Sequence, residues 1–241
     1  CQFGVPIETG QAAQFVADAL SRPHLQVEGF HSHIGSQIFE AAPFCDAVDI
    51  LLDFAHAMRQ AHGFVARTLN LGGGFGVRYR ESDPTVDIPG NIRALADHLR
   101  RGCETKGYPM PRVLLEPGRS IVANAGLTLY RVGGVKTIAG YRSYVTVNGG
   151  MTDNPRYALY QSPYTVVLAN RMNEPPQFRC TVAGRCCESG DLLQEGVLLP
   201  EPRRGDLLAV LTTGAYNYSM ASNYNRIPRP PILMLGPEGP Y

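Results

Sequence analysis

Three short motifs in the first half of the 241-residue chain carry side chains suited to acid–base chemistry and anion binding. They are HSHIGSQ with His31, His33 and Ser36, LNLGGGFG with Gly74, and EPGRS with Glu116 and Arg119. The backbone amides of a glycine loop approach a phosphate without obstruction by Cβ atoms. A carboxylate keeps a pyridine nitrogen protonated, and a flat imidazole can lie against the ring. The combination matches what pyridoxal 5'-phosphate requires, with Gly74, His33 and Glu116 in these three roles.

Each motif has a simpler interpretation when it is taken alone. The glycine run lacks the third glycine of GxGxxG, because Val77 stands at that position, and it is equally typical of a tight turn. EPGR by itself is more typical of a surface turn with a local ion pair, and a lone histidine is more often a hydrogen-bonded core residue. The succession of an imidazole, a glycine loop and a carboxylate along the chain favours the cofactor site.

A fourth motif, GRCCESGD at residues 184–191, places Cys186 and Cys187 side by side before Glu188. Adjacent cysteines do not readily bond each other across a trans peptide, and no CxxC or Cys/His spacing offers a metal site. We therefore expect no metal, and reduced thiols at all six cysteines, Cys1 included. A thiol with an ordinary pKa of about 8.5 is mostly protonated at neutral pH and can act as an acid. The alternative for Cys187 is a small hydrophobic residue of the core.

The elements that position the first three motifs alternate between strand and helix. Apolar spacing predicts amphipathic helices at residues 41–62 and 91–101. The runs LQVEGFHSHIG, ARTLNLGGGFG and RVLLEPGR predict buried strands, each opening into a loop at its carboxyl end. Such alternation favours parallel β/α units, and in a β/α barrel the carboxyl ends of the strands share one rim. The three motifs should lie together on that rim.

The second half of the chain has the composition of a β-domain. Short runs rich in β-branched or aliphatic residues predict strands in LTLYRVGGVKTIAG, YRSYVTVNGG, YTVVLANR, FRCTVAG, GDLLAVL and PPILML. The predicted fold class is α/β, with the last strands of a β/α barrel at residues 1–125 and a mostly antiparallel β-domain at residues 126–241.

Six motifs together resemble the bacterial diaminopimelate decarboxylase family of the alanine-racemase-like class: HSHIGSQ, LNLGGGFG, EPGRSIVANAG, GGMTDNPRYALYQ, CCESGD and GAYNYSMASNYN. The resemblance implies a TIM-like barrel that binds pyridoxal 5'-phosphate, followed by a β-domain. It implies a homodimer with active sites at the subunit interface. The implied reaction is decarboxylation of meso-diaminopimelate to L-lysine, the last step of lysine biosynthesis.

The resemblance also implies roles for individual residues. His33 would stack on the cofactor ring, Ser36 and Gly74 would help to hold it, and the turn of Glu116, Pro117, Gly118 and Arg119 would bind ring and phosphate. Tyr216 would reach the phosphate from the second domain. Cys187 would be the proton donor, contributed across the dimer interface, with no part for Cys186. The implied substrate residues are Arg119, Arg156, Tyr160, Glu188 and Tyr216.

Charge supports diaminopimelate as the substrate, since its far end carries both an amine and a carboxylate. Arg156 and Tyr160 suit the carboxylate and Glu188 suits the amine, and a bidentate guanidinium–carboxylate contact is geometrically selective. The alternatives are a solvated surface arginine and a decarboxylase for ornithine, arginine or lysine. Many relatives would carry a proline directly after this arginine, whereas this chain carries Tyr157.

The lysine that holds the cofactor in this class does not match either of the chain's two lysines. Lys106 is predicted in a polar loop after a helix, and Lys136 in the β-rich half. Because the chain also begins at Cys1, we expect a fragment that lacks about five barrel strands and the lysine, and that is inactive by itself. A non-catalytic regulator that kept the fold is the rival interpretation.

Composition narrows the class of partner. The 22 basic and 21 acidic residues balance, with no basic patch of the kind that nucleic-acid binding requires. No apolar run of about eighteen residues and no signal peptide is evident. We therefore expect a cytoplasmic protein with a small amino-acid substrate, and neither nucleic acid nor membrane as a partner.

Overall fold

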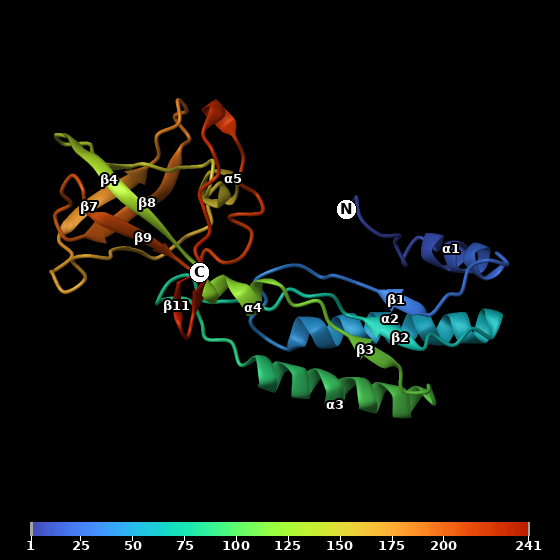
Figure 1. Cartoon of the computed structure of the whole chain (residues 1–241). Helices are drawn as coiled ribbons and strands as arrows, with labels where there is room; N and C mark the ends of the chain where they lie inside the picture. The colour runs from blue at the N-terminus through green and yellow to red at the C-terminus, as the bar shows by residue number, and fades with distance from the viewer. Residues whose placement is uncertain (1, 241) are drawn as a thin grey trace. The chain divides into compact units, whose positions relative to one another are not determined.

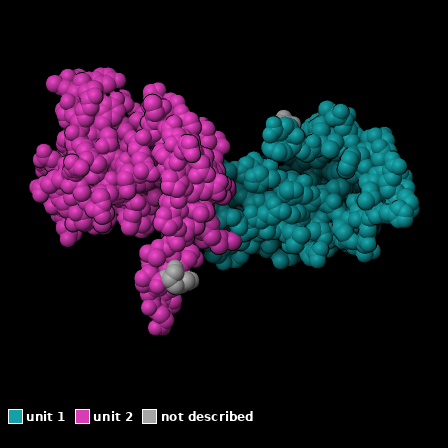
Figure 2. Space-filling view, turned by 45° about the horizontal axis from the view of Figure 1, so that its top comes forward, with its two compact units in different colours: residues 1–77, 84–120 teal, residues 78–83, 121–241 magenta. Residues whose placement is uncertain are grey.

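The computed structural model describes residues 2–240, which form two compact units (Figures 1 and 2). Unit 1 extends to Val77 and resumes at Pro84–Ser120, and unit 2 comprises Arg78–Asp83 and the chain from Ile121 onward. Cys1 lies outside the described residues. The sequence predicts a single boundary near residue 125, and its composition gives no signal for the assignment of Arg78–Asp83 to unit 2.

Unit 1 contains a parallel sheet of three short strands in the order β1 (Gly29–His31), β2 (Thr68–Asn70) and β3 (Arg112–Leu114). α1 (Gln11–Leu20) precedes β1, α2 (Ala42–His62) joins β1 to β2, and α3 (Ile88–Lys106) joins β2 to β3. The predicted parallel β/α units are confirmed. Only β2 is as buried as predicted, because β1 and β3 are the two edge strands of this sheet.

The two long helices have recognisable ends. α2 carries a proline in its first turn and closes on Gly63 in the left-handed conformation. α3 begins at Asp87, whose Oδ1 accepts from the Gly90 amide at 2.9 Å, and closes on Gly107. α2 follows the predicted range, whereas α3 is longer than predicted. Lys106 is therefore in the last turn of a helix, where it pairs with Asp53, and the predicted loop position is wrong.

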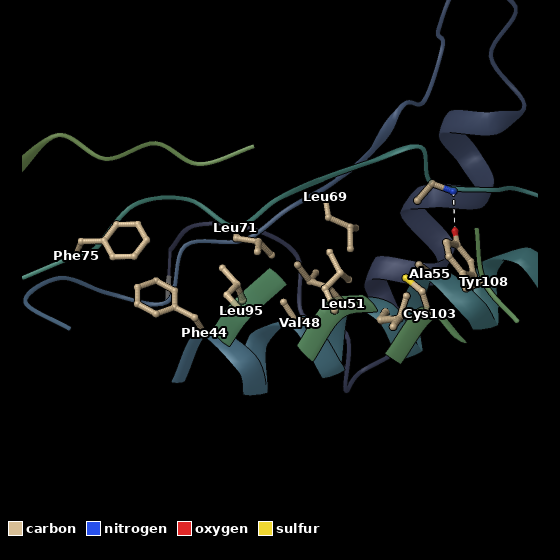
Figure 3. Close-up of a cluster of buried hydrophobic side chains, with 13 residues drawn as sticks. Phe44, Val48, Leu51, Ala55, Leu69, Leu71, Phe75, Leu95, Cys103 and Tyr108 are labelled. Carbon is tan, nitrogen blue, oxygen red and sulfur yellow. Dashed lines mark hydrogen bonds between the residues drawn. The ribbon is translucent and has the colours of Figure 1, made fainter. Parts of the chain in front are cut away.

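The core of unit 1 lies between these helices and the sheet (Figure 3). α2 and α3 pack against each other, and their apolar faces meet the side chains of β2 and the loop after it. The Tyr108 hydroxyl accepts a hydrogen bond from the Ala66 amide at 2.8 Å. The largest fully buried side chains of this core are Phe44, Leu52, Leu69, Leu71 and Leu99. Truncating such a leucine to alanine costs about 2–5 kcal/mol of folding free energy. This packing fixes the strands whose ends carry the predicted site.

Unit 2 is built on a six-stranded sheet in the order β6-β9-β4-β5-β7-β8. The strands are β4 (Leu127–Ile138), β5 (Arg142–Val147), β6 (Val166–Leu168), β7 (Phe178–Ala183), β8 (Leu192–Leu199) and β9 (Leu207–Leu211). All neighbouring pairs are antiparallel except β5 and β7. The prediction of a mostly antiparallel second half is confirmed.

The remaining elements of unit 2 are short. α4 (Arg119–Val122) crosses the boundary between the two units in the chain. It is followed by the 3-10 turn η1 (Ala123–Ala125) and β4, and α5 (Arg156–Tyr160) follows β5. η2 (Tyr224–Arg226) comes before the two-residue strands β10 (Leu235–Gly236) and β11 (Gly239–Pro240). The strand predicted in PPILML is mostly absent, because Pro230 and Pro231 have no amide to donate. Among residues 2–240 no helix has the length and apolarity to cross a membrane.

Candidate functional site

The carboxyl ends of the three parallel strands bring polar side chains together, as predicted for a rim. His31 and Asn70 are the last residues of β1 and β2 and lie opposite each other in the sheet. Asn70 Nδ2 donates to Glu116 Oε1 at 2.7 Å, and His31 Nε2 lies 3.5 Å from Glu116 Oε2. The His31 and Glu116 side chains are 52% and 56% exposed. The Glu116 carboxylate is thus oriented by two neighbours while it stays open to solvent.

The glycine loop after β2 lies so close to neighbouring backbone that a residue with a Cβ atom would clash there. A Cβ on Gly73 would lie 2.2 Å from the backbone oxygen of Glu116, and one on Gly74 would lie 2.4 Å from that of Gly35. Gly74 also has a φ of 105°, which side chains rarely allow. The loop therefore requires glycine at these positions, and we call residues 72–74 the glycine cradle. The cradle is in contact with the other two predicted motifs.

Two amides of the glycine loop already donate hydrogen bonds within the protein, which limits the amides that could bind an anion. The Gly72 amide donates to Asn70 Oδ1 at 3.0 Å, and the Gly73 amide donates to His33 Nδ1 at 3.3 Å. His33 therefore acts as an acceptor through Nδ1. The Gly74 amide makes no hydrogen bond within residues 2–240. Gly74 is the loop position best suited to a phosphate oxygen.

The loop after β1 is pinned to the glycine loop by a side chain that the sequence analysis missed. Gln37 donates to the Val77 oxygen at 3.0 Å and accepts from the Val77 amide at 2.9 Å. The neighbouring Ser36 accepts from Arg119 Nη2 at 2.9 Å, and Arg119 is buried at the start of α4. Ser36 and Arg119 are thus brought together. The cofactor roles of Pro117 and Gly118, which lie in the turn before α4, stay predictions.

In unit 2 the predicted carboxylate-binding residues form one cluster. Arg156 is the first residue of α5 and is buried. Its guanidinium carbon lies 5.4 Å from the centre of the Tyr160 ring and 5.0 Å from that of Tyr216. The Arg156 cation is therefore largely shielded from water and lies close to two aromatic rings, which are themselves exposed. This arrangement rules out the solvated surface arginine considered above.

Two more polar residues complete the surroundings of Arg156. Its Nη2 donates to Ser162 Oγ at 3.3 Å. Tyr164 donates to Asn217 Oδ1 at 3.1 Å, next to Tyr216 in the chain. Burial raises the pKa of Tyr164 to about 12, so its hydroxyl stays protonated across the physiological range. These contacts fix the segment that carries Tyr216, which has a left-handed backbone with φ 69°.

The two-cysteine segment is held by a buried carboxylate, Asp191, which is 3% exposed. Asp191 accepts from the Met151 amide at 2.6 Å and from the Cys186 amide at 2.7 Å. A Cβ on Gly150 or Gly184 would lie within 2.5 Å of this carboxylate, so both positions require glycine. Burial and the Asp191 charge raise the pKa of the Cys186 thiol, which is therefore protonated at neutral pH.

Cys187 and Glu188 are exposed on this segment. The Cys187 amide donates to Asn225 Oδ1 at 2.7 Å, which ties the segment to η2. Glu188 Oε1 accepts from Ser189 Oγ at 3.3 Å and from the Gly190 amide at 3.1 Å. Within the described residues Glu188 forms no ion pair. The roles of Cys187 as acid and Glu188 as amine ligand stay predictions.

Asp153 adds a titratable group beneath the loop that leads to Arg156. It accepts from the Tyr130 hydroxyl and, at 3.1 Å, from the Gly150 amide. Burial raises the pKa of Asp153, and burial and Asp153 raise that of Tyr130 well above its ordinary value. The pair of Asp153 and Tyr130 supports the same loop as Asp191, because Asp153 binds the Gly150 amide and Asp191 binds the Met151 amide.

The raised pKa of Asp153 predicts a pH effect on stability. A carboxyl whose pKa rises on folding favours the folded state below its unfolded pKa of about 3.9, and this contribution is lost as the pH rises through the folded value. Relative to Asp153→Asn, the wild type should be most stable near pH 4 and lose that advantage toward neutrality. Urea unfolding of the full-length protein at several pH values measures this. The exposed Asp97→Asn is the control, and a wild-type advantage that grows toward neutral pH would contradict the prediction.

Comparison with known proteins finds similarity to enzymes over nearly the whole chain. Residues 1–123 match the family model described as pyridoxal-dependent decarboxylase, pyridoxal binding domain. The diaminopimelate decarboxylase of Bacillus subtilis is 44% identical over 234 residues, which are 97% of this chain and 53% of that protein. The diaminopimelate decarboxylase of Halalkalibacterium halodurans is 47% identical, with the same coverage of 97% and 53%. The chain spans about half the length of these curated relatives.

A solved structure extends the similarity to the whole fold. The crystal structure of diaminopimelate decarboxylase from M. jannaschii in co-complex with L-lysine matches with a TM-score of 0.88 and 32% identity. The match covers 100% of this chain and 54% of that one. Both units therefore have counterparts in a single enzyme.

Proposed function

This chain belongs to the pyridoxal-dependent decarboxylase family, and from that premise we propose that the full-length protein converts meso-diaminopimelate to L-lysine. The observation that carries the proposal is the cluster of Arg156 between Tyr160 and Tyr216, in a chain that also contains a pyridoxal binding domain. The similarity to diaminopimelate decarboxylases over 97% of the chain supports it.

The residues at the strand ends of unit 1 fit pyridoxal 5'-phosphate. The glycine cradle leaves the Gly74 amide for a phosphate oxygen, and the oriented Glu116 carboxylate suits a protonated ring nitrogen. His33 is exposed beside the cradle and presents a flat ring, and Ser36 is held by Arg119. Pyridoxal 5'-phosphate supplies an electron-accepting ring for the electron pair left by the departing carboxylate. Glu116 would hold the ring nitrogen protonated and so keep the ring able to accept electrons.

Cys187 is the proposed proton donor, in a homodimer in which the neighbouring subunit supplies this thiol. After carbon dioxide leaves, the carbon that carried it needs a proton to complete L-lysine. The Cys187 side chain is exposed, while its backbone is fixed by Asn225 and by the Asp191 contact to Cys186. An accessible thiol on an ordered segment is suited to proton donation.

Arg156 is proposed to select the substrate by its distal carboxylate. Diaminopimelate carries a carboxylate at each end, and L-lysine keeps the far one after the other has left. Glu188 is proposed to receive the distal amine. A bidentate contact with Arg156 would bind both compounds and give nothing to 1,5-diaminopentane, which has the same length without carboxylates.

Arg156→Ala in the full-length protein is therefore expected to raise KM for meso-diaminopimelate by about 10- to 100-fold, the usual size of a lost charged hydrogen bond. The inhibition constant of L-lysine should rise by a similar factor, and that of 1,5-diaminopentane should stay the same. Steady-state assays of carbon dioxide release measure all three. The exposed Arg131→Ala of β4 is the matched control. Equal losses for all three compounds would refute the carboxylate role.

A wild-type full-length protein with no such activity on meso-diaminopimelate would overturn the proposal. Release of carbon dioxide from ornithine or lysine instead would indicate another basic amino acid as the substrate. Binding of pyridoxal 5'-phosphate without any decarboxylation would support the non-catalytic regulator.

A further inference from the structure

Tyr157, the residue after Arg156 on α5, connects this helix to the sheet of unit 2. Its side chain is buried, and its hydroxyl donates to Glu195 Oε2 on β8 at 2.7 Å. The other oxygen of Glu195 accepts from Arg142 Nη1 on β5 at 2.5 Å. The Glu195 carboxylate is thus shared between a helix residue and a strand residue, and its position is determined by both.

The short helix α5 depends on such an anchor. It has five residues, and no side chain caps its N-terminus. A helix of this length is not stable alone, so its position is set by tertiary contacts. α5 packs against β8, the strand that carries Glu195. The hydrogen bond from Tyr157 is the polar contact that links the two elements.

The chemistry of the Tyr157 hydroxyl suits a permanent anchor. Burial and the hydrogen bond to Glu195 raise the pKa of Tyr157 to about 12. The hydroxyl therefore remains protonated, and so a donor, around neutral pH. On the other side of the carboxylate, the Arg142 guanidinium donates to Glu195 and forms an ion pair with it.

We infer that Tyr157 is a positioning residue: by fixing α5 on β8 it holds the Arg156 guanidinium between Tyr160 and Tyr216, where the distal carboxylate of the substrate binds. The inference rests on the proposed function. It assigns a task to Tyr157, the residue beside Arg156 whose hydroxyl reaches the sheet.

The inference is tested by Tyr157→Phe in the full-length protein, which removes one hydroxyl and keeps the ring. We expect KM for meso-diaminopimelate and the inhibition constant of L-lysine to rise together by about three- to tenfold, the effect of a lost buried hydrogen bond. The value of kcat should change by less than about twofold, and the inhibition constant of 1,5-diaminopentane should not change. A role in stability alone would instead lower the melting temperature and leave the selectivity among the three compounds unaltered.

Three further variants keep the test decisive. Tyr144→Phe on β5 is the matched control, since the Tyr144 hydroxyl makes no hydrogen bond with the described residues although its ring lies 5.9 Å from the Arg142 guanidinium carbon. Glu195→Gln keeps an acceptor oxygen for Tyr157 and should raise KM less than Glu195→Ala. This comparison also applies if Tyr157→Phe does not fold.

The outcomes separate the two proposals. An active wild type with unchanged constants in Tyr157→Phe would overturn the positioning role and leave the proposed function intact. Equal rises for L-lysine and 1,5-diaminopentane would likewise overturn it. A wild type that does not decarboxylate meso-diaminopimelate would overturn the proposed function, and the positioning role with it.

Discussion

Cys187→Ala is expected to lower the kcat of the full-length protein by about 10²- to 10⁴-fold, the usual contribution of a positioned general acid. The thiol is exposed on a segment fixed on both sides, by Asp191 through Cys186 and by Asn225 directly. Without it, water must supply the proton to the carbon that loses carbon dioxide. KM should change little, because no described contact joins Cys187 to the Arg156 cluster. Steady-state assays of carbon dioxide release measure both constants.

A second measurement isolates the proton step. In deuterium oxide the wild type should place one deuterium on that carbon in a single configuration, and Cys187→Ala should give a mixture. Cys186→Ser is the matched control, because it keeps the backbone amide that Asp191 binds, and it should stay within about threefold of wild type. A Cys187→Ala enzyme with nearly full kcat would remove Cys187 from the reaction.

Gly73→Ala should abolish tight binding of pyridoxal 5'-phosphate. The added Cβ would lie 2.2 Å from the Glu116 backbone oxygen, and neither backbone can yield without separating the glycine loop from the Glu116 turn. Overpacking of this kind costs about 3 kcal/mol, and a loss of that size in binding weakens affinity by about a hundredfold. Fluorescence titration of the full-length protein with pyridoxal 5'-phosphate measures the affinity.

Gly133→Ala on β4 is the control for this substitution. Its Cβ would lie 3.5 Å from Thr146 Oγ1, an ordinary contact, and both affinity and melting temperature should stay close to wild type. Melting curves of both variants separate a loss of folding from a loss of binding. An alanine at position 73 that leaves the affinity within threefold of wild type would show that the cradle does not hold the phosphate.

The sequence predicts best those elements whose bounds depend on residues within the element itself. The apolar spacing of α2 reflects one face packed on one core, and its range is predicted almost to the residue. α3 is longer than its apolar stripe because its ends are set by Asp87 and Gly107, which lie outside the stripe. β8 is missed because Gln194, Glu195 and Gly196 interrupt its apolar pattern. Those polar residues bind other segments, so only the tertiary structure explains them.

The candidate site shows the same division. Residue types and chain order predict that His33, Gly74 and Glu116 meet at one rim, because parallel strands align their ends. The supporting residues Asn70 and Gln37 act on partners about forty or more positions away, and a single sequence carries no signal for such pairs. Asn70 has a weak local sign, since it is an amide at the end of a buried strand. Asp191 has one too, as the acid that closes CCESGD.

Tyr157 illustrates how a departure from an expected pattern can acquire meaning only in three dimensions. In the sequence it is a tyrosine in place of a proline, and it leaves the presentation of Arg156 open. In the structure its hydroxyl reaches Glu195 and the neighbouring guanidinium is buried between two rings. The Tyr157 side chain therefore links the residue after Arg156 to the sheet.

The short segment Arg78–Asp83 belongs to unit 2 although the chain on both sides of it belongs to unit 1. Thr165 binds the Tyr79 backbone oxygen through its amide at 3.1 Å and its hydroxyl at 2.7 Å, so the segment is an integral part of that unit. A gene cut once at the main junction would leave each product with a missing or foreign piece. A single recombination breakpoint at that junction could therefore not transfer unit 2 as a complete piece.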